Sequence, residues 1–193
     1  MTSDKRERIL KAATKIFAKK GFYNAKVTEI AKKAHVADGT IYLYFEGKDD
    51  LLIALFDEQM VPIIKRIRRR VNKEATALEK LRRFIFLHLD MVERNQDLAM
   101  VLVVELRQSA KFMHDYPGTK FKEYLQVISD IIIEGQKNDE FHKSINPSIA
   151  KQVIFGALDD VATNWLVSKN KSIKLTDFAG EIENLLLHGV IAK

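Results

Sequence analysis

Residues 28 to 45 read Thr28-Glu-Ile-Ala-Lys-Lys-Ala-His-Val-Ala-Asp-Gly-Thr-Ile-Tyr-Leu-Tyr-Phe45, two short helical patterns separated by a tight corner. Each pattern places small or branched apolar residues on one side, at the spacing of a helix: Ile30, Ala31 and Ala34 in the first, over about 28–34, and Ile41 and Phe45 in the second, over about 39–45. A polar second helix that is held by a first helix places side chains in the major groove of DNA. The run therefore predicts a DNA-binding motif.

An amphipathic helix is expected immediately before this motif, over about 4–20. Its apolar residues follow the i, i+3, i+4, i+7 rule and Gly21 stands just past its end: Ile9, Ala12, Ala13, Ile16 and Phe17. Three such helices would share one small core. The sequence thus predicts an N-terminal helix-turn-helix domain over residues 1–47.

Excess positive charge is confined to this N-terminal part. Residues 1–48 carry 11 Lys and Arg against 5 Asp and Glu, whereas residues 49–193 carry 21 of each, and the whole chain has a formal charge of +6. Clustered positive charge attracts the phosphate backbone through counterion release. A solvated charged face is the alternative interpretation, but its coincidence with the helical motif favours DNA binding.

Helical periodicity continues through residues 48–193, and no run shows the alternating pattern of a strand. A long fourth helix is expected from Lys48, with a kink at Pro62, since an internal proline removes a backbone hydrogen bond. Five more helices are expected over about 76–94, 97–109, 118–138, 147–168 and 175–191. The predicted fold is therefore all-α with nine helices, and residues 48–193 form a second, helical domain.

Composition excludes several other classes. The chain has no cysteine, and its five histidines show no metal-ligand spacing, so neither a disulfide framework nor a metal site is expected. No nucleophile elbow or phosphate loop is present, which argues against an enzyme. The charged N-terminus and the short apolar runs predict neither a signal peptide nor a membrane span. A cytoplasmic protein without a cofactor is the expectation.

The N-terminal motif resembles the helix-turn-helix of TetR-family transcriptional regulators. The resemblance rests on Ala12-Ala13, Phe17, Gly21-Phe22, Ile30-Ala31, Ala34 and Gly39-Thr-Ile-Tyr-Leu-Tyr-Phe45, followed by Lys48 and Leu51-Leu52. In that family this region meets base edges and phosphates. The resemblance implies DNA contact for Thr40, Tyr42, Tyr44 and Lys48, with core packing as the alternative for Tyr42. Four further residues are candidate DNA contacts: Lys26, Thr28, Asp38 and Gly39.

Three positions depart from the usual pattern of the family. His35 stands at the corner where glycine is common, so a positive φ with some strain is expected. Ala37 replaces a frequent serine cap, which favours Asp38 as the cap of the next helix; reading a cytosine amino group is the alternative. Lys26 replaces a small hydroxyl residue, so either Thr28 caps the helix or Lys26 meets a phosphate.

Two segments of the second domain resemble the FadR-type fatty-acid-degradation regulators within the same family: Leu98–Ser109 and Ala150–Trp165. The resemblance implies a repressor that long-chain acyl-CoA releases from DNA. An apolar tunnel with cations at its mouth would suit that effector. The candidate effector residues are Leu102, Arg107, Phe121, Leu125, Ile128, Phe155, Asp160, Asn164 and Trp165.

Polar residues interrupt the apolar stripes of these segments and need partners. Glu105 and Arg107 lie in the first segment, and Asp160, Thr163 and Asn164 in the second. A ligand would supply such partners. A satisfied structural network, such as Arg107 with Asp159 or Asp160, is the alternative.

A homodimer is expected, because the last two helices carry glycines and an apolar stripe that one subunit does not obviously cover. The candidate interface residues are Gly156, Phe178, Ile182, Leu185, Leu186 and Gly189. A two-fold dimer would read a palindromic double-stranded operator. Two alternatives stay open: a regulator of efflux or another gene that responds to a lipophilic drug or metabolite, and an architectural protein that binds DNA without sequence preference. Activation or repression is not decided by the residues.

Overall fold

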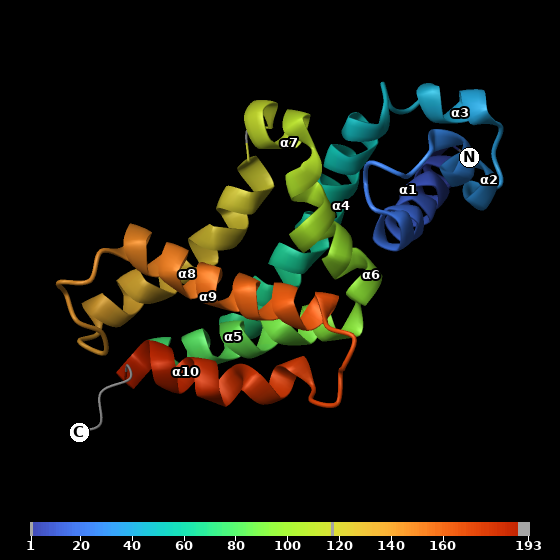
Figure 1. Ribbon diagram of the computed structural model, residues 1–193. Helices are drawn as coiled ribbons and strands as arrows, with labels where there is room; N and C mark the ends of the chain where they lie inside the picture. The colour runs from blue at the N-terminus through green and yellow to red at the C-terminus, as the bar shows by residue number, and fades with distance from the viewer. Residues whose placement is uncertain (1, 117, 189–193) are drawn as a thin grey trace. The chain divides into compact units, whose positions relative to one another are not determined.

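The computed structural model describes residues 2–116 and 118–188, and every regular element within these ranges is a helix (Figure 1). Ten α-helices and three shorter helical segments follow one another in this described part of the chain: α1 (Thr2–Lys20), α2 (Val27–Ala34), α3 (Asp38–Tyr42), α4 (Lys48–Val71), α5 (Ala77–Arg94), α6 (Gln96–Ala99), η1 (Met100–Val104), η2 (Glu105–Gln108), α7 (Ala110–Asp115), α8 (Thr119–Lys137), α9 (Pro147–Val167), η3 (Leu175–Phe178) and α10 (Ala179–His188). The all-α prediction is confirmed.

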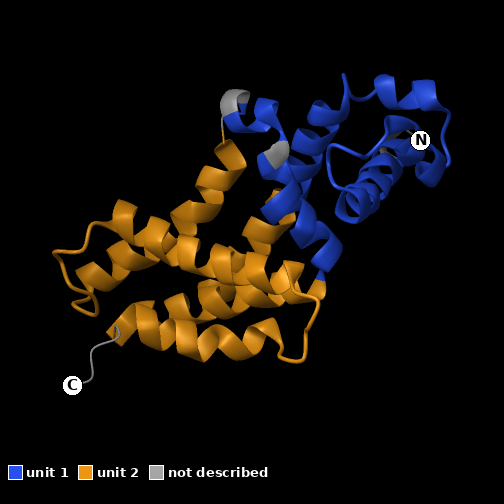
Figure 2. Cartoon of the chain, in the orientation of Figure 1, with its two compact units in different colours: residues 1–59, 95–117 blue, residues 60–94, 118–193 orange. Residues whose placement is uncertain are grey.

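The helices form two compact units (Figure 2). Unit 1 combines residues up to 59 with residues 95–117, and unit 2 combines residues 60–94 with those from 118 onward. Helix α4 therefore contributes its first half to one unit and its second half to the other. This division by packing differs from the predicted domain boundary at residues 47 and 48, because the segment 95–117 folds together with the N-terminal helices.

The core of the first three helices is the one that the sequence predicts. Ile9, Ala13 and Phe17 of α1 are completely buried, as are Ile30 of α2 and Ile41 of α3. Burial of each isoleucine and phenylalanine side chain among these contributes about 1.5–3 kcal/mol relative to an exposed one. Helix α3 has only five residues, so its position depends on this packing rather than on its own helical stability.

The segment predicted as one helix over 97–109 is more varied in the structure. It starts as α-helix (α6), continues as a π-helix over Met100–Val104 and ends as a 3-10 helix over Glu105–Gln108. A π-turn inserts an extra residue and rotates the side chains that follow it. The uninterrupted apolar run from Leu98 to Val104 gave no sign of this change.

Helix α7 has no counterpart among the nine predicted helices, and it is the additional one that brings the α-helices of the described residues to ten. Its cap is Ser109, whose hydroxyl accepts a hydrogen bond from the backbone N–H of Phe112 and donates one to Asp49 at 2.6 Å. The Phe112 ring then meets Phe56 edge-on at 5.3 Å. Contacts to the first half of α4 thus fix this short helix, and a single-sequence pattern does not show them.

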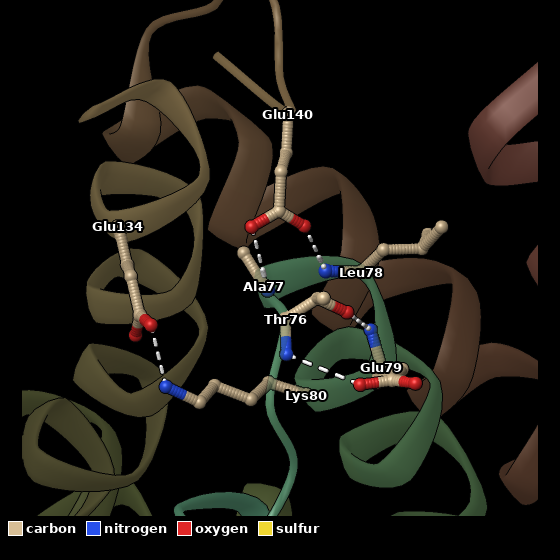
Figure 3. A network of polar contacts seen from close by, with 7 residues as sticks. All are labelled: Thr76, Ala77, Leu78, Glu79, Lys80, Glu134 and Glu140. Carbon is tan, nitrogen blue, oxygen red and sulfur yellow. Dashed lines mark hydrogen bonds and ion pairs between the residues drawn. The ribbon is translucent and has the colours of Figure 1, made fainter. Parts of the chain in front are cut away.

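Unit 2 is a bundle in which α5 lies against α8, α9 and α10 (Figure 1). A capping box starts α5: the Thr76 hydroxyl accepts from the Glu79 backbone N–H, and the Glu79 carboxylate accepts from the Thr76 N–H, both at 3.1 Å. Glu140, from the α8–α9 loop, accepts from the next two N–H groups (Figure 3). These backbone hydrogen bonds are the main reason why the pKa of Glu140 is lowered.

Two further differences concern helices α4 and α10. Helix α4 continues through Pro62 as one element, as the predicted long helix does, and the kink expected at Pro62 stays a prediction. The helix predicted over 175–191 begins instead with the 3-10 turn η3 and becomes α-helical at Ala179. Its expected end lies outside the described residues, as does Gly189.

Candidate DNA interface and effector region

The corner between α2 and α3 has the predicted left-handed backbone. His35 has φ 55° and ψ 49°, and the N–H of Val36 donates to the carbonyl of Ala31 at 3.1 Å. This is the hydrogen bond of a Schellman motif, which ends a helix at a residue with positive φ. Histidine adopts this conformation at a cost that most other non-glycine residues exceed.

Neither Asp38 nor Thr28 takes the cap position, so the cap predicted at Asp38 is wrong and Thr28 is not the cap of α2. Helix α3 begins at Asp38 itself, and Ala37 takes the cap position without a side-chain hydrogen bond. Helix α2 begins at Val27, so the cap position belongs to Lys26 rather than to Thr28. The Glu29 carboxylate accepts from the Lys26 backbone N–H at 3.4 Å. Tertiary packing holds these helix starts, and Asp38 supports α3 only through its charge in the first turn.

The outward side of α3 is exposed. Tyr42 is 60% exposed and Leu43, at the end of the helix, is 81% exposed. Asp38 and Gly39 are exposed as well, and Thr40 and Tyr44 are half-buried. Leu43 was not among the predicted contacts. Its position 200° around the helix from buried Ile41 was the available signal, because each residue turns a helix by 100°.

Two lysines flank this surface. Lys26 is exposed, whereas Lys48 donates to the carbonyl oxygens of Tyr23 at 2.9 Å and Ala25 at 3.3 Å. The Lys48 ammonium also lies 4.6 Å from the centre of the Phe22 ring. Lys48 therefore fixes the α1–α2 loop to the start of α4, in addition to its predicted role at a phosphate.

Glu105, in the second stretch of chain that belongs to unit 1, contacts the same α1–α2 loop. Its side chain is only 7% exposed and accepts a hydrogen bond from the backbone N–H of Phe22 at 2.7 Å. Gly21, with φ 77°, would bring a Cβ within 3.4 Å of the Glu105 carboxylate. This polar intrusion into an apolar stripe thus has a structural partner 83 residues away.

The predicted effector residues divide between the two units. Leu102 and Arg107 belong to unit 1, and Phe121, Leu125, Ile128, Phe155, Asp160, Asn164 and Trp165 to unit 2. Local partners hold the polar ones. Arg107 donates to the carbonyl of Val103 at 2.6 Å, and Asn164 donates to the carboxylate of Asp160 at 3.1 Å. That these residues line one site stays a prediction.

An aromatic cluster occupies the centre of unit 2. The Phe121 and Phe155 rings meet edge-on with centres 5.2 Å apart, and Phe155 in turn stands perpendicular to His88 at 6.0 Å. The Tyr124 ring centre is 5.6 Å from that of Phe84, which is fully buried. Of the predicted effector residues, Phe121 and Phe155 belong to this cluster and are half-buried, whereas Ile128 is completely buried in the core of unit 2.

A polar pair lies inside this cluster. His88 is 3% exposed, and its Nδ1 is 2.6 Å from the hydroxyl oxygen of Tyr124. Burial lowers the pKa of the His88 imidazole to about 4 and raises the pKa of the Tyr124 phenol, with the charge of Asp159 adding to the latter effect. Both groups are therefore uncharged at neutral pH. Sequence reasoning considered His88 only as a metal ligand and did not place it here.

A separate apolar pocket of about 830 Å³ lies at the end of unit 2 where the α8–α9 loop meets α5, α9 and α10. Its lining includes Ile145, Ile149, Val153 and Leu186, with Arg82 among its polar residues. Of the predicted interface residues that the structure describes, Leu186 alone borders it. The i, i+4 spacing of Ile145, Ile149 and Val153 was a signal for it in the sequence.

The described part of the chain holds neither a metal-binding cluster nor a membrane span. Within residues 2–116 and 118–188, no three His, Asp or Glu side chains gather in a way that would hold a metal ion. Over the same ranges, no helix has the length and hydropathy needed to cross a membrane.

Family models cover nearly the whole chain. Residues 9–55 match the model of bacterial regulatory proteins of the tetR family, and residues 56–189 match that of the C-terminal region of YsiA-like proteins. The chain belongs to the TetR family. Members of the TetR family are DNA-binding transcriptional regulators rather than enzymes, and α3 lies within the residues that the N-terminal family model matches.

Full-length relatives support this membership. A fatty acid metabolism regulator protein of Bacillus subtilis is 36% identical over 94% of this chain and 93% of its own length. FadR from Bacillus subtilis, solved in complex with stearoyl-CoA, superposes with a TM-score of 0.89 at 35% identity over 96% of this chain and 99% of its own. FadR from Bacillus halodurans gives 0.90 at 36% identity, over 98% and 97%. The TetR-like fold is thus shared along both halves of the chain.

Proposed function

We propose that this TetR-family protein is a homodimeric repressor of fatty-acid metabolism genes that leaves a palindromic operator when it binds a long-chain fatty acyl-CoA. It would act in the bacterial cytoplasm, where the operator lies. The proposal needs a DNA-reading surface, a face for a second subunit and an apolar region for the acyl chain.

One observation carries the proposal. A relative solved with stearoyl-CoA matches this chain at 35% identity over 96% of its length, which includes the half that varies with the effector. The aromatic and aliphatic core of unit 2 is compatible with a hydrocarbon chain, since apolar surfaces favour each other in water. The basic N-terminal segment is compatible with an operator.

An exposed apolar face on α9 and α10 supports the dimer. Ile149 and Val153 of α9 are 58% and 57% exposed, and Leu185 of α10 is 49% exposed. A Cβ added at Gly156, on the same face of α9, would meet no atom within 4 Å, so a partner helix has room to approach. Ile182 is instead 7% exposed and packs within unit 2, so it supports this face from inside.

Titration of the purified protein with stearoyl-CoA and with coenzyme A tests the effector. The expected result is tight binding of the thioester, weak binding of coenzyme A, and release of operator fragments that the protein has selected from genomic DNA. Equal affinity for both molecules would contradict the acyl-CoA proposal. Mass spectrometry of ligand that co-purifies with the protein then distinguishes a drug or another metabolite.

Sedimentation of Val153→Arg tests the dimer, because a buried charge on the α9 face should produce monomers. Met113→Arg is the matched control, since Met113 is 57% exposed but belongs to unit 1. A Val153→Arg protein that remains dimeric would place the interface elsewhere.

A further inference from the structure

His88 keeps one ring nitrogen without a hydrogen bond. Its Nδ1 is engaged by Tyr124, but Nε2 is fully buried and has no partner in the part of the chain that the structure describes. Leaving a buried polar atom unpaired costs about 1–3 kcal/mol, so such atoms are rare and need a reason. A bound molecule that reaches Nε2 would supply the missing partner.

The Tyr124 contact determines what Nε2 offers. A phenol is the stronger acid of the two groups, so its O–H donates to the imidazole rather than the reverse. The 2.6 Å separation between Nδ1 and the phenol oxygen is that of a short hydrogen bond, which is compatible with an O–H donor. A neutral imidazole that accepts at Nδ1 carries its proton at Nε2. The open nitrogen is therefore an N–H donor.

Aromatic rings lie around His88, with the ring centres of Phe84, Tyr124 and Phe155 6.4, 6.1 and 6.0 Å from that of the imidazole. The Phe155 ring stands edge-on to His88, and Phe121 lies beyond it. Both phenylalanines are half-buried, so the cluster leads from the surface of unit 2 towards His88. One N–H donor at the inner end of an aromatic wall suits a ligand with one neutral acceptor next to a long alkyl chain.

We propose that His88 donates a hydrogen bond from Nε2 to the thioester carbonyl oxygen of the acyl-CoA effector. This inference rests on the proposed function and adds to it a specificity residue. Tyr124 is a positioning residue in this arrangement, since it fixes the tautomer of His88 without touching the effector. Phe121 and Phe155 would contact the first carbons of the acyl chain.

A pair of ligands isolates this hydrogen bond. Stearoyl-CoA has the thioester carbonyl, and S-octadecyl-CoA, a thioether, lacks it but keeps the chain and the coenzyme. Calorimetric titration of the full-length protein should give about tenfold tighter binding of the thioester, the effect of one hydrogen bond of about 1.4 kcal/mol. The His88→Phe protein keeps an aromatic ring but no donor and should bind the two ligands equally.

Each outcome decides. Equal affinities in the wild-type protein, or a tenfold preference that persists in His88→Phe, would overturn the role of His88. If His88→Phe does not fold, Tyr124→Phe replaces it: a preference reduced to threefold or less supports the proposal, and an unchanged preference refutes it. If the wild-type protein binds neither ligand better than coenzyme A, the proposed function fails first and the inference falls with it.

Discussion

The two units each contain a buried polar side chain, and the two side chains differ in their hydrogen-bond partners. Glu105 of unit 1 is 7% exposed, and its carboxylate accepts the backbone N–H of Phe22. His88 of unit 2 is 3% exposed and uses one nitrogen, while the other has no partner among the described residues. In the DNA-reading unit the buried polar atom fixes a loop. In unit 2 the unpartnered nitrogen is the donor of the hydrogen bond that we propose to the effector.

We expect a lower pH to reduce the stability of unit 2 through protonation of His88. Its pKa is lowered to about 4, below the ordinary 6.5, so the folded protein resists protonation and the unfolded chain does not. The stability that the neutral ring contributes is complete above about pH 6.5 and is lost as pH falls from there towards 4. The loss at pH 4 should be about 3 kcal/mol.

Urea unfolding of the wild-type protein and of His88→Gln at pH 7 and pH 4 measures this loss. The glutamine variant keeps a polar side chain at position 88 that does not titrate. The effects of pH on all other titratable groups therefore cancel in the difference between the two proteins. A pH dependence that is the same in both would mean that His88 is protonated equally in the folded and unfolded states.

Removal of the Glu105 carboxylate should destabilise unit 1. Glu105→Ala leaves the Phe22 N–H buried without an acceptor, at a cost of about 2 kcal/mol in the free energy of unfolding. Glu105→Gln keeps an acceptor oxygen and should lose less than half as much. Thermal unfolding checks both. Equal losses in the two variants would show that the negative charge, and not the hydrogen bond to the loop, is what matters.

Tyr42 tests whether the exposed side of α3 reads DNA. Tyr42→Ala should lower operator affinity about tenfold with little change in stability, because the side chain is 60% exposed and a base or phosphate contact contributes about 1–3 kcal/mol. Fluorescence anisotropy at fixed salt is the measurement. Met113→Ala is the control, since Met113 is exposed to a similar extent in unit 1 but lies on α7.

The sequence predicted what depends on local pattern and missed what depends on distant contacts. Helical periodicity gave α1 to α3 and their core, and the positive φ at His35 followed from the resemblance to a family in which glycine is common at that corner. The cap at Ala37 was missed because tertiary packing replaces the side-chain cap. The π-helix could not be predicted from the run over 98–104. Every residue in this run is apolar, so the run shows no periodicity that would distinguish a π-helix from an α-helix.

The candidate sites show the same limit. Glu105 was recognised as a polar intrusion, but its partner Phe22 is 83 residues away and no spacing rule connects them. His88 looked like an ordinary histidine, because the unpaired nitrogen exists only once α5, α8 and α9 are packed together. The exposure of Tyr42 needed no such knowledge, since the helical period turns it 100° away from buried Ile41.

Substitution of Gly39 has the smallest expected effect, and it distinguishes a change in stability from a change in DNA binding within unit 1. It lies inside α3, and a Cβ there would meet no atom within 4 Å. Gly39→Ala should therefore raise the free energy of unfolding by about 0.5–1 kcal/mol, because alanine favours a helix more than glycine does. If Gly39 touches the operator as predicted, the same methyl group should weaken DNA binding severalfold. Higher stability with unchanged operator affinity would remove Gly39 from the DNA contacts and leave that role to its exposed neighbours on α3.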